Sequence, residues 1–138
     1  MRIFSYLFLL TCMISCSSSH KTSVSKYPLN GTWVPVREEM NGKALPAAAF
    51  STQKLIINDD HYIFNAESED TGDLSYANGT MDIYGRKGVN TGKHFMTRYK
   101  MENGHLIICY NLAGTSYPAD FETKGKPGYF LAEYEKKP

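Results

Sequence analysis

The stretch that decides the fold is LNGTWVPVREEMNG, residues 29–42, which contains the only tryptophan of the chain. It ends in Asn41-Gly42, and Asn-Gly is the strongest short signal for a β-hairpin because both central residues of a type I′ turn need a positive φ. Similar turn signals recur between apolar or aromatic runs at Asn58-Asp59-Asp60, Asn78-Gly79, Asn103-Gly104 and Pro127-Gly128. This spacing predicts a series of short antiparallel strands.

Composition favours the same fold class. A chain of 138 residues with 42% hydrophobic residues suits one small domain, and its ten Tyr and seven Phe favour strands over helices. The one helical signal is LPAAAFS, residues 45–51, with Pro46 at a plausible first helical position. We predict eight strands, at residues 32–40, 54–58, 61–66, 72–77, 80–86, 94–102, 105–112 and 129–136.

Closure of the sheet follows from the strand count. An antiparallel meander has two exposed edges unless the sheet closes on itself, and closure into a barrel removes them. We therefore predict that residues 29–138 form an all-β, eight-stranded up-and-down antiparallel barrel with one short helix. A two-layer sandwich is the alternative architecture.

A family resemblance supports the barrel. The segments LNGTWVPVREEMNGKALP, KLIINDDHYIF, GTMDI and GYFLAEYEK resemble a family of small bacterial lipocalin-like proteins, first noted as numerous paralogues in planctomycetes. The resemblance covers residues 29–136, and its most specific parts are Gly31-Thr32-Trp33 and NGKALP at residues 41–46. It implies a lipocalin-like barrel, and it brings neither catalytic residues nor an established ligand.

Trp33 is predicted to seal the narrow end of this barrel. In a closed meander the last strand pairs with the first, so Trp33 should lie near residues 134–136. Lipocalins typically stack a basic side chain on this tryptophan, and the candidates are Lys136 and Lys137 on the paired strand and Arg98 and Lys100 across the barrel. The predicted closure set is Gly31, Trp33 and Lys136, and the alternative is an exposed Trp33 that anchors a partner.

The N-terminus predicts export. Its apolar run of about 12 residues is shorter than the roughly 20 that span a bilayer, so residues 1–15 are interpreted as a signal peptide. MISC resembles the bacterial lipobox, which implies cleavage before Cys16 and acylation of that residue. Cys12 in LLTC competes, but Thr11 is a poorer small residue at the cut than Ser15. A plain secretory signal is the remaining alternative.

The next segment and the charge balance indicate the environment. Residues 16–28 are rich in Ser and predict a flexible tether between the lipidated Cys16 and the barrel. Ser17 is not Asp, so the enterobacterial sorting rule favours the outer membrane of the cell envelope. After the signal peptide, 14 basic residues balance 14 acidic ones, which argues against nucleic acid as a partner. Cys109 would then be the one remaining thiol, with no intramolecular disulfide.

The chain offers little catalytic or metal chemistry. His61, His94 and His105 start predicted strands without HxH or HxxxH spacing, so we expect solvated or capping roles and no zinc site. ESEDTGD, residues 67–73, resembles part of a calcium loop, but Asn78 stands where the chelating Glu is expected, so a solvated acidic hairpin is predicted. No nucleophile motif or phosphate loop is present. We predict no enzyme, no cofactor and no metal.

Two functions from different classes remain. In the first, the barrel binds a small apolar or amphipathic molecule, since eight strands enclose an interior that side chains fill or that holds one small ligand. In the second, a packed barrel acts as a scaffold or inhibitor that grips an envelope protein through residues 111–128. LPAAAFS would cross the barrel mouth with Phe50 as a lid. The candidate pocket or lid residues are Phe50, Tyr62, Phe64, Tyr76, Phe95, Tyr99 and Tyr110.

Overall fold

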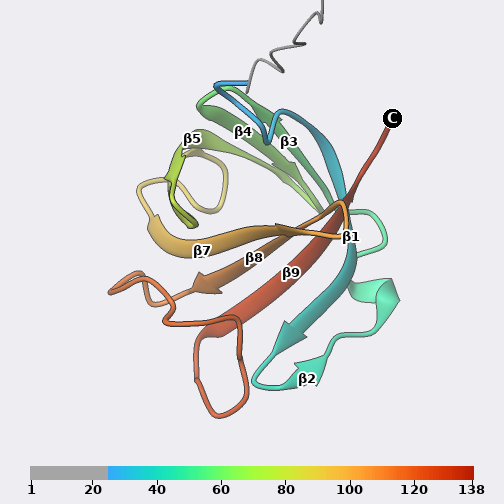
Figure 1. The fold of residues 1–138 in the computed structure, drawn as a ribbon, viewed down its shortest axis with the longest axis vertical. Helices are drawn as coiled ribbons and strands as arrows, with labels where there is room; N and C mark the ends of the chain where they lie inside the picture. The colour runs from blue at the N-terminus through green and yellow to red at the C-terminus, as the bar shows by residue number, and fades with distance from the viewer. Residues whose placement is uncertain (1–24) are drawn as a thin grey trace, which may run out of the picture.

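Eight of the nine strands run up and down in chain order and close through a pairing of the first strand with the last (Figure 1). The structure is a computed structural model that describes residues 25–138. The predicted signal peptide and the predicted acylation site, Cys16, lie outside these residues. The strands are β1 Gly31–Met40, β2 Lys43–Ala44, β3 Lys54–Asn58, β4 His61–Asn65, β5 Glu69–Ala77, β6 Thr80–Lys87, β7 His94–Glu102, β8 His105–Asn111 and β9 Tyr129–Lys136.

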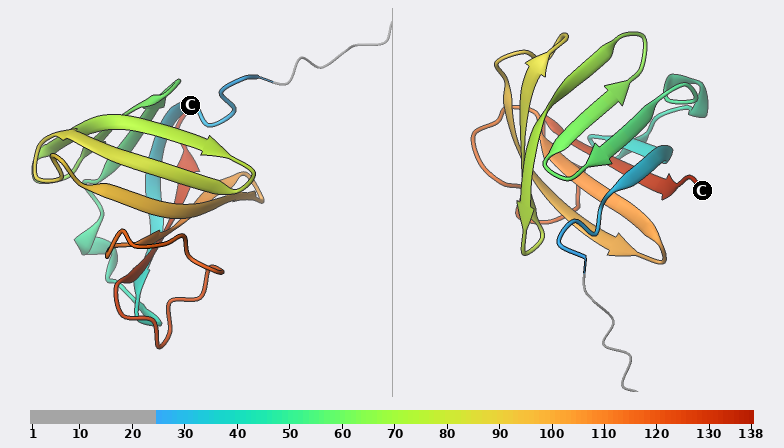
Figure 2. Two further views of the ribbon diagram at one scale, coloured as in Figure 1. Left: turned by 90° about the vertical axis from the view of Figure 1, so that its left-hand side faces the viewer. Right: turned by 90° about the horizontal axis from the view of Figure 1, so that it is seen from above.

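The sheet order β2-β1-β3-β4-β5-β6-β7-β8-β9, with β1 also paired to β9, confirms the predicted antiparallel barrel. Seen from above, the strands wrap around a common interior (Figure 2). The two-residue β2 is an extra strand that the sequence did not predict. Asn41, Asn78 and Asn103 have positive φ angles of 49°, 50° and 51°, each followed by a positive-φ glycine. The three Asn-Gly pairs therefore form the tight turns that their sequence predicts.

Strand β1 closes the barrel because it is long enough to pair with two other strands, β3 and β9. Gly31 to Trp33 pair with β3, and the strand from Trp33 to Met40 pairs with β9. The register shifts between Pro35 and Arg37, which marks a β-bulge at Val36. Bulges increase the bend and twist of a strand, and β1 needs both to pass from β3 to β9.

The predicted short helix is only a 3₁₀ turn, η1, at Ala47–Ala49. In residues 25–138 no helix is long and apolar enough to cross a bilayer. The preceding β2 pairs with the end of β1, and the Leu45 N–H donates to the carbonyl of Glu38 at 2.8 Å. These bonds hold the segment beside β1 (Figures 1 and 2). The position of the segment across the barrel mouth stays a prediction.

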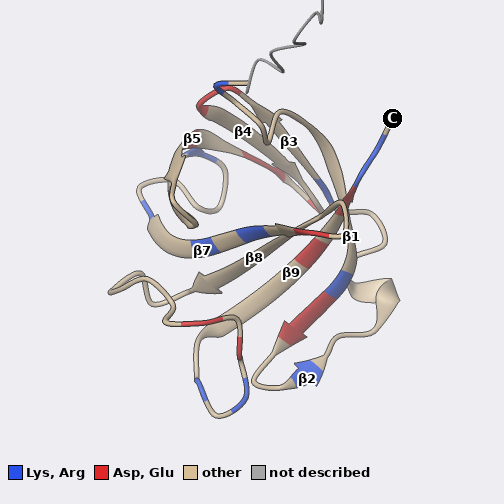
Figure 3. Cartoon of the chain, in the orientation of Figure 1, with Lys and Arg blue, Asp and Glu red and all other residues tan. Residues whose placement is uncertain are grey.

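The connection at residues 112–128 covers the outside of the barrel. Strand β8 carries no charged residue (Figure 3), and its outward Ile107 and Cys109 are buried. Within the connection, Pro118 and Thr123 are fully buried. The carbonyl of Pro118 accepts a hydrogen bond from Arg98 on β7 at 2.8 Å. This cover explains why β8 is apolar on both faces.

The same connection is tied to the β1–β2 hairpin. The hydroxyl of Thr123 accepts a hydrogen bond from the Gly42 N–H at 2.9 Å and donates one to the Glu39 carboxylate. The Asn41 side chain accepts a further bond from the Gly125 N–H at 3.1 Å. These bonds make the long connection part of the folded domain.

Candidate functional site

The closed end of the barrel is organised around Trp33, which is only 1% exposed. Its indole N–H donates to the carbonyl of Leu29 at 2.8 Å, which satisfies the one polar atom of the ring. Trp33 lies directly opposite Lys136 in the β1–β9 register, as predicted, and the Lys136 ammonium is 5.4 Å from the ring centroid. This arrangement is a cation–π contact.

Gly31 is part of the same closure. Its φ is +140°, a region that side chains disfavour, and a methyl group added there would overlap the Lys136 side chain. Gly31 therefore leaves room for the lysine to pass over Trp33. The packing of Lys136 therefore explains why a glycine stands two residues before the tryptophan in the first strand.

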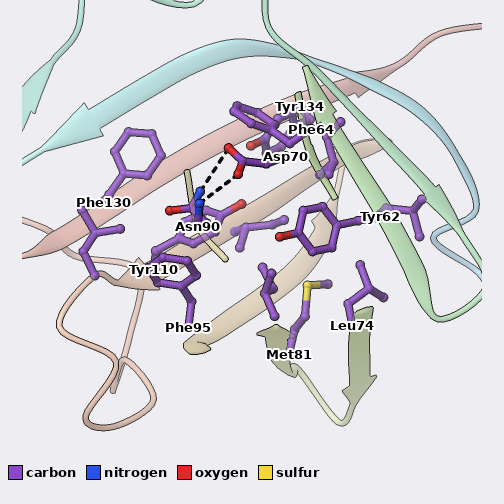
Figure 4. A pocket seen from close by; sticks show the side chains of 15 residues that line it. Tyr62, Phe64, Asp70, Leu74, Met81, Asn90, Phe95, Tyr110, Phe130 and Tyr134 are labelled. Carbon is purple, nitrogen blue, oxygen red and sulfur yellow. Dashed lines mark hydrogen bonds between the residues drawn. The ribbon is translucent and has the colours of Figure 1, made fainter. Parts of the chain in front are cut away.

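The barrel interior also contains a cavity of about 200 Å³. Figure 4 shows its lining, which is mainly apolar and aromatic and comes from seven strands and two connections. The cavity extends toward the end opposite Trp33, where the connections at residues 66–68, 88–93 and 112–128 lie. The lining residues are Leu55, Ile57, Tyr62, Phe64, Asp70, Leu74, Met81, Ile83, Asn90, Phe95, Ile108, Tyr110, Leu112, Phe130 and Tyr134.

Two polar side chains interrupt this lining. Asp70 is 4% exposed, and its Oδ1 accepts a hydrogen bond from the Asn90 backbone N–H at 2.9 Å. Its Oδ2 accepts a second bond from the Asn90 side-chain amide at 3.3 Å (Figure 4). Asp70 lies opposite Phe64 on β4, so its side chain points to the inner face of the sheet. The solvated acidic hairpin predicted for residues 67–73 is therefore wrong at Asp70, because β5 begins earlier than predicted.

A second buried carboxyl group, Glu38, lies close to two cavity tyrosines. Glu38 is 3% exposed, and burial raises its pKa from 4.5 to about 7, although a hydrogen bond with Gln53 partly opposes the increase. Burial also raises the pKa of Tyr110 to about 12, and the nearby Glu38 adds to that effect. The hydroxyl groups of Tyr110 and Tyr134 share a hydrogen bond. The barrel interior thus contains acidic and phenolic groups among its apolar residues.

The structure separates the predicted pocket residues into two sets. Tyr62, Phe64, Phe95 and Tyr110 line the cavity. Tyr76 and Tyr99 pack against the hydrophobic core in an edge-to-face pair, with ring centroids 5.7 Å apart, outside the cavity lining.

Phe50 is also outside the cavity lining, although it is buried with 7% exposure. The lid at Phe50 therefore stays a prediction. Hydrogen bonds of β2 and Leu45 hold the chain before Phe50 beside β1.

Sequence reasoning missed Asp70, Asn90 and Glu38. Asp70 had a usable signal, since Leu74, Gly72 and Asp70 alternate along β5 and share the inner face. Asn90 lies in the connection between β6 and β7, and the sequence around it gave no signal of an inward-facing side chain. Glu38 points inward only because the bulge at Val36 shifts the alternation of β1 by one residue.

The three strand-start histidines each bond to a carboxylate. His61 contacts Asp73 at 3.0 Å, and His94 contacts Asp82 at 2.6 Å. The third pair, His105 with Glu133, is also separated by 2.6 Å. Within residues 25–138 no group of three or more metal-ligating side chains is arranged to hold a metal ion. Comparison with known proteins finds no matching family model, curated protein or solved structure.

Proposed function

We propose that this protein is a membrane-anchored lipoprotein of the bacterial envelope whose lipocalin-like barrel binds a small apolar or amphipathic molecule. The observation that carries the proposal is the cavity of about 200 Å³, enclosed by a closed barrel and lined mainly by apolar and aromatic side chains. Ligand sites commonly combine such a lining with a few placed polar groups. Asp70 and Asn90 are polar groups of this kind.

The volume limits the size of the ligand. Drug-sized ligands occupy pockets of roughly 300–1,000 Å³, whereas an engineered apolar cavity of roughly 150 Å³ binds benzene. A cavity of about 200 Å³ therefore suits a molecule with one aromatic ring or a short alkyl chain. Long fatty acids and retinoids are too large for the cavity as it stands.

The position of the anchor is compatible with ligand entry. The described chain enters the barrel at Leu29, next to Trp33, at the closed end. The cavity extends toward the opposite end of the barrel, where Asn90 and Leu112 contribute to the lining. A lipid attached to Cys16 through the Ser-rich tether would leave the mouth accessible.

The scaffold alternative depends on residues 111–128 gripping a protein partner. Hydrogen bonds from Arg98 and Gly42 hold this connection against the barrel, and its buried Pro118 and Thr123 cover β8. The connection therefore has a structural role already, which favours the cavity as the functional feature.

Ligand binding is tested by thermal unfolding of the full chain with neutral one-ring probes, 2-phenylethanol and indole. A ligand that binds only the folded state stabilises it, by about 2.7 kcal/mol at a concentration 100 times its Kd. We expect a higher Tm with at least one probe. A Leu74→Trp variant, which fills the cavity, should lose the increase. No stabilisation of the parent protein by either probe would contradict a ligand-binding cavity.

The anchor is tested by metabolic labelling with a clickable palmitate analogue. The label should be lost in a Cys16→Ala variant and retained in a Cys12→Ala variant. The reverse pattern would move the anchor to Cys12, and an unlabelled parent protein would contradict the lipoprotein proposal.

A further inference from the structure

We propose that the ligand of the cavity is a small organic cation, a protonated amine with an apolar body about the size of one aromatic ring. Asp70 would bind the ammonium group, and the aromatic lining would bind both the charge and the apolar body. This inference rests on the proposed function, because it names the ligand class of the same cavity.

The charge of the cavity interior favours a cation. The lining of the cavity contains the Asp70 carboxylate but no Lys, Arg or His. Among the described residues no ion pair involves Asp70 or the other buried acidic residue, Glu38. Lys93 bonds to Oδ1 of Asn90 at 3.1 Å and makes no ion pair with Asp70. Buried charges in proteins are usually paired, so an unpaired buried carboxylate beside a cavity favours a cationic ligand.

Asp70 has unused hydrogen-bonding capacity. An ionised carboxylate offers about four lone-pair sites, and Asn90 uses two of them. Neither bond comes from a charged donor. An ammonium group placed in the cavity could donate to the remaining sites, and hydrogen bonds of this charge-assisted type are about twice as strong as neutral ones.

The Asp70 carboxylate is held in place before any ligand arrives. Gly88 in the β6–β7 connection has a φ of +96°, and a methyl group added there would overlap Asp70 Oδ1. The connection therefore packs directly against the carboxylate. Its own turn is fixed by the Thr91 hydroxyl, which donates to the Gly88 carbonyl at 2.7 Å. A fixed carboxylate loses little freedom when it binds a ligand.

The cavity lining is rich in aromatic side chains. Aromatic faces attract cations, and groups of them are used to recognise organic ammonium ions. The same faces also accept an aromatic or aliphatic body, so one surface serves both parts of an amphipathic amine. The aromatic lining residues are Tyr62, Phe64, Phe95, Tyr110, Phe130 and Tyr134.

The same chemistry disfavours other ligand classes. An apolar acid would bring a second negative charge next to Asp70, and like charges repel strongly at low dielectric. A neutral ligand would displace water from the carboxylate without replacing its hydrogen bonds fully. Three probes of matched size should therefore differ in affinity: the amine should bind most tightly, the neutral alcohol less tightly and the acid most weakly.

The test is calorimetric titration of the full chain at neutral pH with phenethylamine, 2-phenylethanol and 3-phenylpropionate. These probes share a phenyl ring and differ in the charge at the end of a short chain. We expect the amine to bind about tenfold or more tightly than the alcohol, as a hydrogen bond to a charged group implies. The acid should bind weakest.

Two variants assign the preference to Asp70. Asp70→Asn should reduce the preference for amine over alcohol to about threefold or less while retaining alcohol binding. Asp73→Asn is the matched control, because Asp73 lies on the same strand but bonds outward to Arg86 at 2.6 Å. It should keep the full preference.

The outcomes separate the two proposals. If alcohol and amine bind the parent protein equally, the cation inference is wrong and ligand binding stands. If neither binds, both are wrong. If the amine preference survives in a folded Asp70→Asn variant, another group recognises the cation. Should Asp70→Asn not fold, the ranking of the three probes on the parent protein still decides the inference.

Discussion

At both ends of the barrel, alternate residues of each strand face inward, but one end is packed with side chains and the other surrounds a cavity. At the closed end, Trp33 is 1% exposed, its N–H is satisfied by Leu29, and Lys136 covers the ring. At the open end, equally hydrophobic inward-facing side chains surround a cavity of about 200 Å³. The polar Asp70 is part of its lining. An inward-facing position on a strand therefore does not by itself say whether the interior is filled.

The difference arises from how the strands are connected at each end. Tight turns join β3 to β4, β5 to β6 and β7 to β8 at the closed end, and Trp33 and Lys136 fill the junction of β1 with β9. At the other end, longer connections join the strands, and one of them positions Asn90 to donate hydrogen bonds to Asp70.

The largest expected effect is at the closed end. Trp33→Ala should lower the free energy of unfolding by about 3 to 5 kcal/mol, because it leaves a void in a fully buried site that cannot collapse. Phe95→Ala, in the cavity lining, should cost less, about 1 to 2 kcal/mol, because Phe95 is only half-buried and borders open space. Urea unfolding followed by circular dichroism measures both. Equal costs would remove the distinction between a packed end and an open one.

The second effect is a pH dependence that arises from Glu38. Its pKa is about 7 in the folded protein instead of the usual 4.5, so the folded state holds the proton more tightly than the unfolded state. The associated stability is fully present below about pH 4.5 and is lost as the pH rises through 7. The free energy of unfolding should therefore fall by roughly 3 kcal/mol at most between pH 4.5 and 8.

Glu38→Gln isolates this effect, because Gln is uncharged at every pH and similar in size. Urea unfolding at intervals of one pH unit should show a smaller decline in the variant than in the parent protein. A decline of the same size in both would mean that Glu38 does not titrate in this range. The parent protein should also be less stable than the variant at pH 8.

The smallest expected effect tests the cation over the indole. Lys136→Met retains the aliphatic stem that covers Trp33 but removes the charge, and should cost about 0.5 to 1 kcal/mol. The emission of Trp33, the single tryptophan, should remain that of a buried ring. A loss as large as that of Trp33→Ala would show that the Lys136 ammonium contributes far more than a cation–π contact.

The sequence by itself determined the strands, their antiparallel order and the closure of the sheet. Asn-Gly pairs require positive φ at their central residues, so Asn78-Gly79 and Asn103-Gly104 specify tight turns without help from distant residues. Alternation with a period of two places Tyr62 and Phe95 inside for the same local reason. The pairing of Trp33 with Lys136 follows once the first and last strands must meet.

Only the tertiary structure decided where the interior is empty and which polar groups enter it. The bulge at Val36 turns Glu38 inward, and it arises from the bend that closure imposes on β1. Asn90 reaches Asp70 across 20 residues of chain, and the turn at Ala47–Ala49 lies beside β1 because β2 pairs there. Such contacts depend on the paths of distant segments through space, and no local pattern of residues encodes them.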